Sequence, residues 1–273
     1  MSVDGAQPGT AGIAPVAGDE AAGLAAFSLA GRTALVTGVS RGIGRGIAVG
    51  LAAAGADLVL AGRAGSMDDT RAMVEGLGRE VVTLDLDLAH PEDVANGSLD
   101  ERLPADVDIL VNNAGVIHRE PALTVDADAW GRVLDVNLNS MFFLTQRVAG
   151  PMLARGRGKI INIASLLSFE GGLGVTSYTA SKHAVAGLTR ALSNEWASRG
   201  VQVNAIAPGY IVTDNTAQLR ADPSRTKGID DRIPAGRWGL PSDLVGAAVF
   251  LASSASDYVT GHVLLVDGGW SGR

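Results

Sequence analysis

The sequence predicts an α/β fold, a single domain built on a doubly wound sheet of seven parallel strands with helices on both faces. Short runs of β-branched and apolar residues alternate with longer helical patterns from Thr33 onward. These runs are almost continuously apolar, as expected for strands that are covered on both faces of a parallel sheet. With 273 residues, of which 47% are hydrophobic, the chain is large enough to bury such a sheet.

Seven strands and four crossover helices follow from this alternation. The strands are expected at residues 33–37, 57–61, 80–84, 108–112, 159–164, 201–206 and 262–266. The crossover helices that parallel strands need are expected at residues 43–54, 130–154, 178–198 and 241–252. Because ligands bind at the carboxyl ends of the strands in such a sheet, functional residues are expected there.

Two segments fall outside the alternation. Residues 1–26 are rich in Ala, Gly and Pro with hardly any large apolar side chain, so we expect a mobile N-terminal tail before a domain at residues 27–273. Residues 210–240 are rich in charge and turn formers and follow a predicted strand at the ligand-binding edge. Long insertions at such an edge often cover a site, so a lid-like insertion is expected there.

Composition and charge argue against several classes of function. The net charge of −7 and the lack of any Lys/Arg cluster give no surface for nucleic acid or for an acidic membrane. The chain has no cysteine, which removes disulfides and sulfur-bound zinc and fits a cytoplasmic protein. No apolar run approaches the roughly 20 residues that span a bilayer. The four histidines are scattered, and no metal site is expected.

A glycine-rich loop follows the first predicted strand, in the string T-G-V-S-R-G-I-G-R-G at residues 37–46. Gly38, Gly42 and Gly44 form a G-x-x-x-G-x-G pattern, which lets the backbone turn tightly and approach a pyrophosphate closely. The helix that follows would point its amino end at the phosphates. A chain with 36 glycines can also carry such a turn by chance, so the loop alone leaves an ordinary turn open as the alternative.

Further candidates lie at the ends of later strands. Asp87 and Leu88 follow the third strand, and either they face an adenine ring or Asp87 only caps a helix near Pro91. The string N-N-A-G at residues 112–115 follows the fourth strand and is either part of the nucleotide site or a simple turn. Both pairs of alternatives stay open on the residues alone.

Several separated motifs together resemble the short-chain dehydrogenase/reductase family over about residues 27–273. They are T-G-V-S-R-G-I-G, N-N-A-G, Asn137, Ser165, Y-T-A-S-K at 178–182 and P-G at 208–209, in the family's order. Tyr178 and Lys182 stand four residues apart, so on a helix both side chains project toward one site. The resemblance implies a Rossmann fold, a nicotinamide cofactor and a catalytic set made of Asn137, Ser165, Tyr178 and Lys182.

The resemblance also implies a role for each catalytic residue. Tyr178 would act as general base or acid toward a substrate hydroxyl, and Ser165 would hydrogen-bond the reacting oxygen. Lys182 would bind the nicotinamide ribose, and Asn137 would hold a water that links Lys182 to solvent. A nearby ammonium favours the phenolate, and lowering the Tyr178 pKa by about three units requires roughly 4 kcal/mol.

The cofactor is expected to be NAD or NADP, with a slight preference for NADP. A carboxylate at the end of the second strand would bind the ribose 2′-hydroxyl of NAD, but this strand ends in A-G-R-A-G at residues 61–65. Arg63 and Arg41 can instead receive a 2′-phosphate. The expected cofactor-binding residues are Gly38, Ser40, Arg41, Gly42, Ile43, Gly44, Arg63, Asp87, Leu88, Asn113, Ala114, Gly115, Tyr178, Lys182, Pro208, Gly209, Ile211 and Thr213.

Longer strings resemble sugar-acid dehydrogenases of the same family, and reductases of acyl carrier-protein thioesters share parts of them. The strings include I-I-N-I-A-S-L-L-S-F-E-G-G at 160–172 and D-R-I-P-A-G-R-W-G-L-P-S-D-L at 231–244. We therefore expect a small-molecule sugar-acid substrate. Its carboxylate needs a cation, and Arg119 and Arg237 are the candidates, with surface charges as the alternative for both.

Two further expectations concern the class and the assembly of the protein. A catalytically silent nicotinamide-binding regulatory module is the alternative to an enzyme, although such a module would have no need for the complete catalytic set. The family resemblance implies a homotetramer assembled through long helices such as 130–154 and 178–198.

Overall fold

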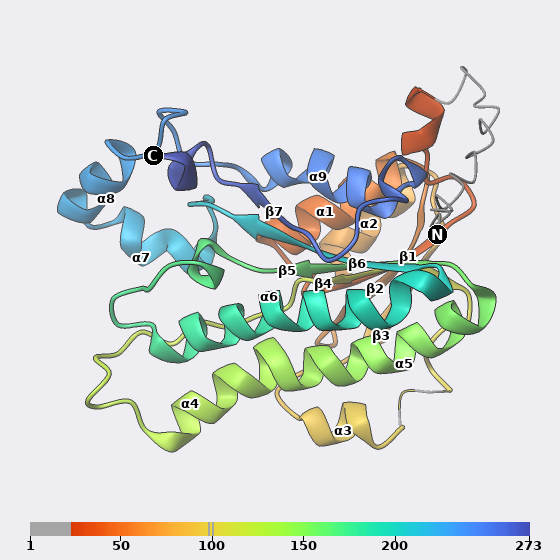
Figure 1. Ribbon diagram of the computed structural model, residues 1–273, viewed down its shortest axis with the longest axis horizontal. Coiled ribbons are helices and arrows are strands. Elements are labelled where there is room, and N and C mark those ends of the chain that lie inside the picture. The colour runs from red at the N-terminus through yellow and green to blue at the C-terminus, as the bar shows by residue number, and fades with distance from the viewer. Residues whose placement is uncertain (1–22, 98, 100) are drawn as a thin grey trace, which may run out of the picture.

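The computed structural model describes residues 23–97, 99 and 101–273, and its centre is one parallel sheet in the order β3-β2-β1-β4-β5-β6-β7 (Figure 1). The strands are β1 (Thr33–Thr37), β2 (Asp57–Gly62), β3 (Val81–Asp85), β4 (Val107–Asn112), β5 (Gly158–Ile163), β6 (Val201–Pro208) and β7 (Val263–Val266). All six neighbouring pairs are parallel. The predicted doubly wound, seven-stranded sheet is therefore confirmed, and each strand end lies within two residues of its predicted position.

The order of the strands reverses beside β1. The chain runs outward from β1 to β3 on one side, then returns to β4, which pairs with the other edge of β1. The loops that follow β1 and β4 therefore leave the sheet next to each other, on opposite sides of the reversal. This is the point at which a doubly wound sheet opens a crevice for a ligand.

Helices cover both faces of the sheet (Figure 1). One face carries α1 (Gly42–Ala53), α2 (Asp68–Gly76) and α9 (Val245–Ala252), and the other carries α3 (Pro91–Ala95), α4 (Ala127–Leu134), α5 (Ser140–Arg155) and α6 (Thr176–Trp196). Neighbouring strand residues point to opposite faces, so Leu35 and Val36 belong to different buried clusters. The continuous apolar runs of the sequence thus serve two cores at once.

The region predicted as a single helix at 130–154 is divided in the structure. Helix α4 ends at Leu134, a π-helical turn covers Asp135–Asn139, and α5 begins at Ser140. The chain is helical throughout the predicted range 130–154, and the prediction missed only the π-helical turn inside it. The division places the buried Asn137 in a turn whose backbone deviates from the α-helix, which is a common arrangement at functional sites.

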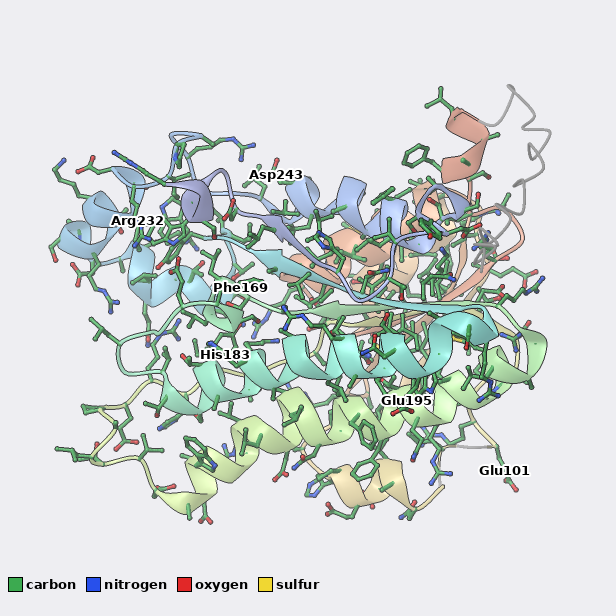
Figure 2. All side chains as sticks on the ribbon, viewed as in Figure 1. Glu101, Phe169, His183, Glu195, Arg232 and Asp243 are labelled. Atoms are coloured by element: carbon green, nitrogen blue, oxygen red, sulfur yellow. The ribbon has the colours of Figure 1, made fainter. Side chains whose placement is uncertain are left out.

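The segment 210–240 contains two short helices, α7 (Ala217–Arg220) and α8 (Pro223–Asp230). Its second half packs in a cluster with Leu166 and Trp270, and Arg232 lies on this segment, away from the sheet (Figure 2). Its action as a lid stays a prediction. Most of the predicted N-terminal tail, residues 1–22, lies outside the described residues, and a 3-10 turn at Leu24–Phe27 precedes β1. In the described part of the chain, no helix combines the length and the apolar character needed to cross a bilayer.

Candidate active site

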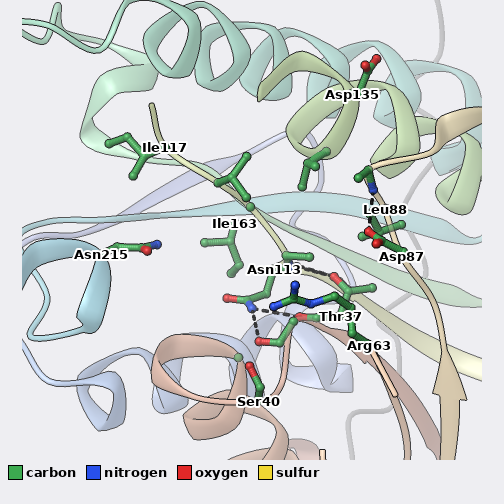
Figure 3. A pocket seen from close by; sticks show the side chains of 18 of the residues that line it. Thr37, Ser40, Arg63, Asp87, Leu88, Asn113, Ile117, Asp135, Ile163 and Asn215 are labelled. Atoms are coloured by element: carbon green, nitrogen blue, oxygen red, sulfur yellow. Dashed lines mark hydrogen bonds between the residues drawn. The ribbon is translucent and has the colours of Figure 1, made fainter. Parts of the chain in front are cut away.

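A cleft of about 980 Å³ opens at the carboxyl ends of the strands, beside the reversal of strand order (Figure 3). Its volume is in the range of small-molecule sites, about 300–1,000 Å³. Fifteen of the expected cofactor-binding residues line it: Gly38, Ser40, Arg41, Gly42, Ile43, Gly44, Arg63, Asp87, Leu88, Asn113, Ala114, Gly115, Tyr178, Lys182 and Thr213.

The other three expected residues, Pro208, Gly209 and Ile211, are not part of the cleft lining. Gly209 packs against Asp267, because a Cβ atom at this glycine would lie 2.6 Å from the Asp267 Cα. Ile211 is buried in the hydrophobic core. Thr213 is the next expected residue along the chain, and it does line the cleft.

The glycine loop is held in shape by Asn113, the second asparagine of N-N-A-G. The Asn113 side-chain amide donates hydrogen bonds to the carbonyls of Thr37 at 2.9 Å and Gly38 at 3.0 Å (Figure 3). Gly38 and Gly42 have φ angles of 69° and 59°, which favour glycine. A Cβ atom on Gly44 would lie 2.2 Å from the Gly38 carbonyl oxygen, so only glycine fits there. The N-N-A-G string therefore fixes the glycine loop beside the cleft, so it is more than a simple turn.

These features fit a dinucleotide. The loop turns into the amino end of α1, where backbone N–H groups without helical partners face the cleft and favour phosphate. At the other end of the cleft lie Asp87 and Leu88, with Arg63 between them and the glycine loop (Figure 3). The Asp87 carboxylate accepts a hydrogen bond from the Ala89 N–H at 2.9 Å, so it also stabilises its own turn. Asp87 does not cap α3, whose N-cap residue is His90 and which has no side-chain cap from that residue, and the contact of Asp87 with an adenine ring stays a prediction.

The catalytic candidates Ser165, Tyr178 and Lys182 come together at the cleft. Tyr178 and Lys182 extend from the same face of α6, and the Lys182 ammonium lies 5.5 Å from the centre of the Tyr178 ring. Ser165 follows β5 and its hydroxyl hydrogen-bonds the Tyr178 phenol, while its oxygen accepts a hydrogen bond from the Leu167 N–H at 3.1 Å. Ser165 is not itself among the residues that line the cleft. Its contact with the site is the hydrogen bond with the Tyr178 phenol.

The pKa of the Tyr178 phenol responds to burial and to two neighbouring side chains. Burial raises the pKa of the Tyr178 phenol, while the hydrogen bond from Ser165 and the positive charge of Arg119 act to lower it. The Lys182 ammonium lies 5.5 Å from the centre of the Tyr178 ring and donates a hydrogen bond to the Ile163 carbonyl oxygen at 2.6 Å. The expectation that Lys182 lowers the pKa of Tyr178 stays a prediction.

Lys182 is itself perturbed. Its side chain is only 4% exposed, and this burial lowers the pKa of the Lys182 ammonium to about 8. Among the described residues, no carboxylate forms an ion pair with it. A buried lysine with a lowered pKa inside a cleft is a typical mark of a functional site.

Asn137 links two segments next to the site through hydrogen bonds. Its side chain donates hydrogen bonds to the Val116 carbonyl at 2.9 Å and the Ser181 hydroxyl at 3.1 Å, and accepts one from the Val116 N–H at 2.8 Å. It therefore ties the loop after N-N-A-G to α6, between Tyr178 and Lys182. Its side-chain amide is fully engaged by the protein, and its expected role in holding a water stays a prediction.

The arginines expected at the site differ in their surroundings. Arg119 lies close enough to Tyr178 to lower the pKa of the phenol, and it donates a hydrogen bond to the Asn215 carbonyl at 2.8 Å. Arg237 binds both carboxylate oxygens of Asp243, at 2.7 Å and 2.9 Å, and lowers the pKa of that carboxyl to about 2. Asp243 lies just before α9 (Figure 2), and Arg237 does not line the cleft, so it is not brought to the site.

Several lining residues were not expected from the sequence. Thr37 ends β1, and its hydroxyl accepts hydrogen bonds from the N–H groups of Asn113 and Ala114, both at 3.0 Å. Its position directly before Gly38 was the signal that could have identified it. Ile117 and Asn215 lie at the end of the cleft opposite Asp87 (Figure 3). Asn215 is in the 210–240 segment, and nothing in its local sequence marks it.

Comparison with known proteins agrees with this geometry. A family model described as enoyl-(acyl carrier protein) reductase matches residues 38–271. The 2-dehydro-3-deoxy-D-gluconate 5-dehydrogenase of Bacillus subtilis is 57% identical over 248 residues, which cover 91% of this chain and 98% of the relative. The chain belongs to the short-chain dehydrogenase/reductase family. Both the family and the narrower resemblance to sugar-acid dehydrogenases are thereby confirmed.

Solved structures of short-chain dehydrogenases/reductases superpose closely on the chain. A protein of Agrobacterium tumefaciens with bound NADP, described as a 2-deoxy-D-gluconate 3-dehydrogenase, is 54% identical with a TM-score of 0.86, covering 91% of this chain and 99% of its own. A gluconate 5-dehydrogenase of Burkholderia cenocepacia, in complex with NADP and tartrate, is 40% identical with a TM-score of 0.84, covering 91% and 98%. The Rossmann arrangement of the family is thus the arrangement of this chain.

Proposed function

We propose that the protein is an NADP-dependent oxidoreductase that interconverts a secondary alcohol and a ketone on a sugar acid, as a 2-dehydro-3-deoxy-D-gluconate 5-dehydrogenase. The observation that carries the proposal is the Tyr178 phenol, hydrogen-bonded by Ser165 and flanked by Lys182 and Arg119 in a cleft built for a dinucleotide. Three relatives that carry this name, from Bacillus subtilis, Dickeya dadantii and Escherichia coli, are 53–57% identical to the chain over 90% or more of its length.

The chemistry follows from the placement of these groups. When bound, the nicotinamide accepts or donates the hydride. Tyr178 removes the proton from the substrate hydroxyl during oxidation and returns it during reduction, for which its position in the cleft is suited. Ser165 hydrogen-bonds the reacting oxygen and stabilises its developing charge. Lys182 holds the ribose through its remaining N–H donors, and Asn137 keeps α6 and the loop after β4 in register.

The preference for NADP is supported by the charges at the end of β2. Arg63 follows β2 and lines the cleft, while β2 ends at Gly62 without a carboxylate side chain. A carboxylate at this position would bind the 2′-hydroxyl of NAD, whereas an arginine matches a phosphate. The Agrobacterium tumefaciens and Burkholderia cenocepacia structures hold NADP, which supports the same choice for this chain.

Arg119 is the proposed partner of the substrate carboxylate. Its charge reaches Tyr178, so a substrate that presents a hydroxyl to the phenol can present a carboxylate to this guanidinium. Arg237 is not proposed for this role, because its guanidinium is already occupied by Asp243. Gluconate 5-dehydrogenase is the second candidate activity, because a relative of that name from Gluconobacter oxydans is 46% identical.

The proposal also covers the location and the assembly of the protein. We infer a cytoplasmic location, supported by the lack of cysteine, and a homotetramer, supported by the family resemblance. Helices α5 and α6, which lie side by side on one face of the sheet, would form its contacts (Figure 1).

The test is a spectrophotometric panel of substrates with NADP and NAD. It contains 2-dehydro-3-deoxy-D-gluconate, gluconate and an acetoacetyl thioester, and the highest kcat/KM is expected for 2-dehydro-3-deoxy-D-gluconate with NADP. Activity on the thioester alone would overturn the sugar-acid assignment. No turnover of any compound by a protein that binds NADPH would favour the silent regulatory module instead.

A matched pair of arginine variants tests the carboxylate partner. Arg119→Gln should raise KM for the sugar acid at least tenfold, since a charge-assisted hydrogen bond contributes about 1.5–3 kcal/mol. Arg237→Gln, which removes an equal charge away from the cleft, should change KM little. Equal effects of the two substitutions would remove the special role of Arg119.

A further inference from the structure

A short piece of the 210–240 segment joins the two sides of the cleft. It consists of residues Thr213–Thr216, and we name it the strap. Its backbone is a 3-10 turn fixed by the Thr216 hydroxyl, which accepts a hydrogen bond from the Thr213 N–H at 3.1 Å. Thr213, Asp214 and Asn215 all line the cleft. The strap is therefore an ordered part of the site.

Neighbouring strap residues hold two arginines that come from different loops. The Asp214 carboxylate pairs with the Arg41 guanidinium at 2.9 Å, and Arg41 belongs to the glycine loop after β1. The Asn215 carbonyl accepts a hydrogen bond from Arg119 at 2.8 Å, and Arg119 belongs to the loop after β4. Arg41 is expected to receive a 2′-phosphate, and the proposed function assigns the substrate carboxylate to Arg119. The strap supplies acceptors to both arginines.

The pairing of Arg41 contrasts with that of Arg63, the other arginine expected to receive a 2′-phosphate. Within the described residues, no ion pair holds the Arg63 side chain. Arg63 lies toward Asp87 and Leu88, whereas Asn215, which follows Asp214, lies at the opposite end of the cleft (Figure 3). A 2′-phosphate would therefore compete with the Asp214 carboxylate for the Arg41 guanidinium.

We propose that Asp214 is a specificity-determining residue, which competes with the 2′-phosphate of NADP for the Arg41 guanidinium and so lowers the preference for NADP over NAD. The inference rests on the proposed function. A phosphate replaces the carboxylate because it carries more charge and more acceptor oxygens, both of which strengthen its hydrogen bonds with a guanidinium. NAD has no such group, so its binding leaves the Arg41–Asp214 pair in place.

The exposure of the pair sets the size of the effect. The side chains of Arg41 and Asp214 are 71% and 66% exposed, so water and salt weaken their attraction. An exposed ion pair of this kind shifts an equilibrium by a factor of about two to five. Removal of the Asp214 charge should therefore tighten NADPH binding by about that factor and leave NADH binding unchanged.

The experiment measures Kd for NADPH and NADH by fluorescence titration of the full-length protein. Four proteins form a double-mutant cycle: the wild type, Asp214→Asn, Arg41→Gln, and the double variant. Asp214→Asn should tighten NADPH binding about two- to fivefold with Arg41 present and have no effect in the Arg41→Gln background. Asp231→Asn is the matched control, because this carboxylate pairs with Lys227 in the same segment and should change neither Kd.

The cycle separates competition from a general effect of charge. If Asp214→Asn tightens NADPH binding equally with and without Arg41, the carboxylate acts by repelling phosphate, and the inference is overturned. Equal tightening of NADPH and NADH, or no tightening of either, overturns it as well. These results leave the proposed function intact, whereas a wild-type protein that binds neither dinucleotide would remove both.

Discussion

Replacement of Ser165 by alanine tests how the site controls its phenol. The Ser165 hydroxyl hydrogen-bonds Tyr178 and acts against burial, which raises the pKa of that phenol. A hydrogen bond to a charged group contributes about 1.5–3 kcal/mol, and one pKa unit corresponds to about 1.4 kcal/mol. Loss of the hydroxyl should therefore raise the pKa of Tyr178 by about one to two units. At a fixed pH below that pKa, less phenolate is then available for oxidation.

The assay is the pH profile of kcat/KM for oxidation of the sugar acid. Its acid limb, which reports the base of the free enzyme, should move to higher pH by about one to two units in Ser165→Ala. A further fall in rate that does not depend on pH is expected from the lost stabilisation of the reacting oxygen. Ser165→Thr retains a hydroxyl at this half-buried position and should keep the limb near its original pH. A uniform fall with an unmoved limb would show that Ser165 does not set the pKa of Tyr178.

Three further substitutions follow from the same structure. Gly44→Ala places a Cβ atom 2.2 Å from the Gly38 carbonyl oxygen, so NADPH binding by calorimetry should weaken at least a hundredfold, while Gly76→Ala, with open space around it, should have no effect. Arg63→Gln should weaken NADPH binding about tenfold and NADH binding little in the same titration. Lys182→Met should abolish turnover but raise the free energy of unfolding in urea by about 3 kcal/mol at pH 7, because burial lowers the pKa of Lys182 from 10.5 to about 8 and one pKa unit corresponds to about 1.4 kcal/mol. That gain should disappear as the pH rises from about 8 to above 10, because the unfolded chain holds the lysine proton over a window in which the folded chain has lost it.

The strands could be predicted from the sequence because their signal is local. The runs that became β4 and β5 are rich in Val, Ile and Leu. All residues of both strands are buried, including the polar Asp108, Asn112, Lys159 and Asn162. The division of the predicted helix at 130–154 could not be found in this way. The π-helical turn contains Asn137, whose partners Val116 and Ser181 come from distant parts of the chain. An asparagine inside an amphipathic pattern gives no sign of such partners.

The site could be predicted where residue type and spacing decide the geometry. Tyr178 and Lys182 project together because a helix places residues four apart on one face. Arginines are less predictable, because a long cation near a cleft takes whichever acceptor the fold brings to it. Arg237 was expected to bind substrate, but Asp243 occupies it. Arg41 was expected to receive a 2′-phosphate, but its guanidinium pairs with the Asp214 carboxylate.

Lys182 is a catalytic candidate whose buried charge has no acidic partner in the part of the chain that the structure describes. An ammonium has three N–H donors, and here one is directed to the Ile163 carbonyl. The described residues provide no carboxylate for its charge, and burial lowers the pKa of the group to about 8. A core selected for stability alone would place an apolar side chain at this position, since a buried charge without a partner is costly. Side chains that lower the stability of the fold are expected at functional sites. Under the proposed function, the ribose hydroxyls would be the partners of the remaining Lys182 donors, so the cost of burying this charge would be offset by cofactor binding.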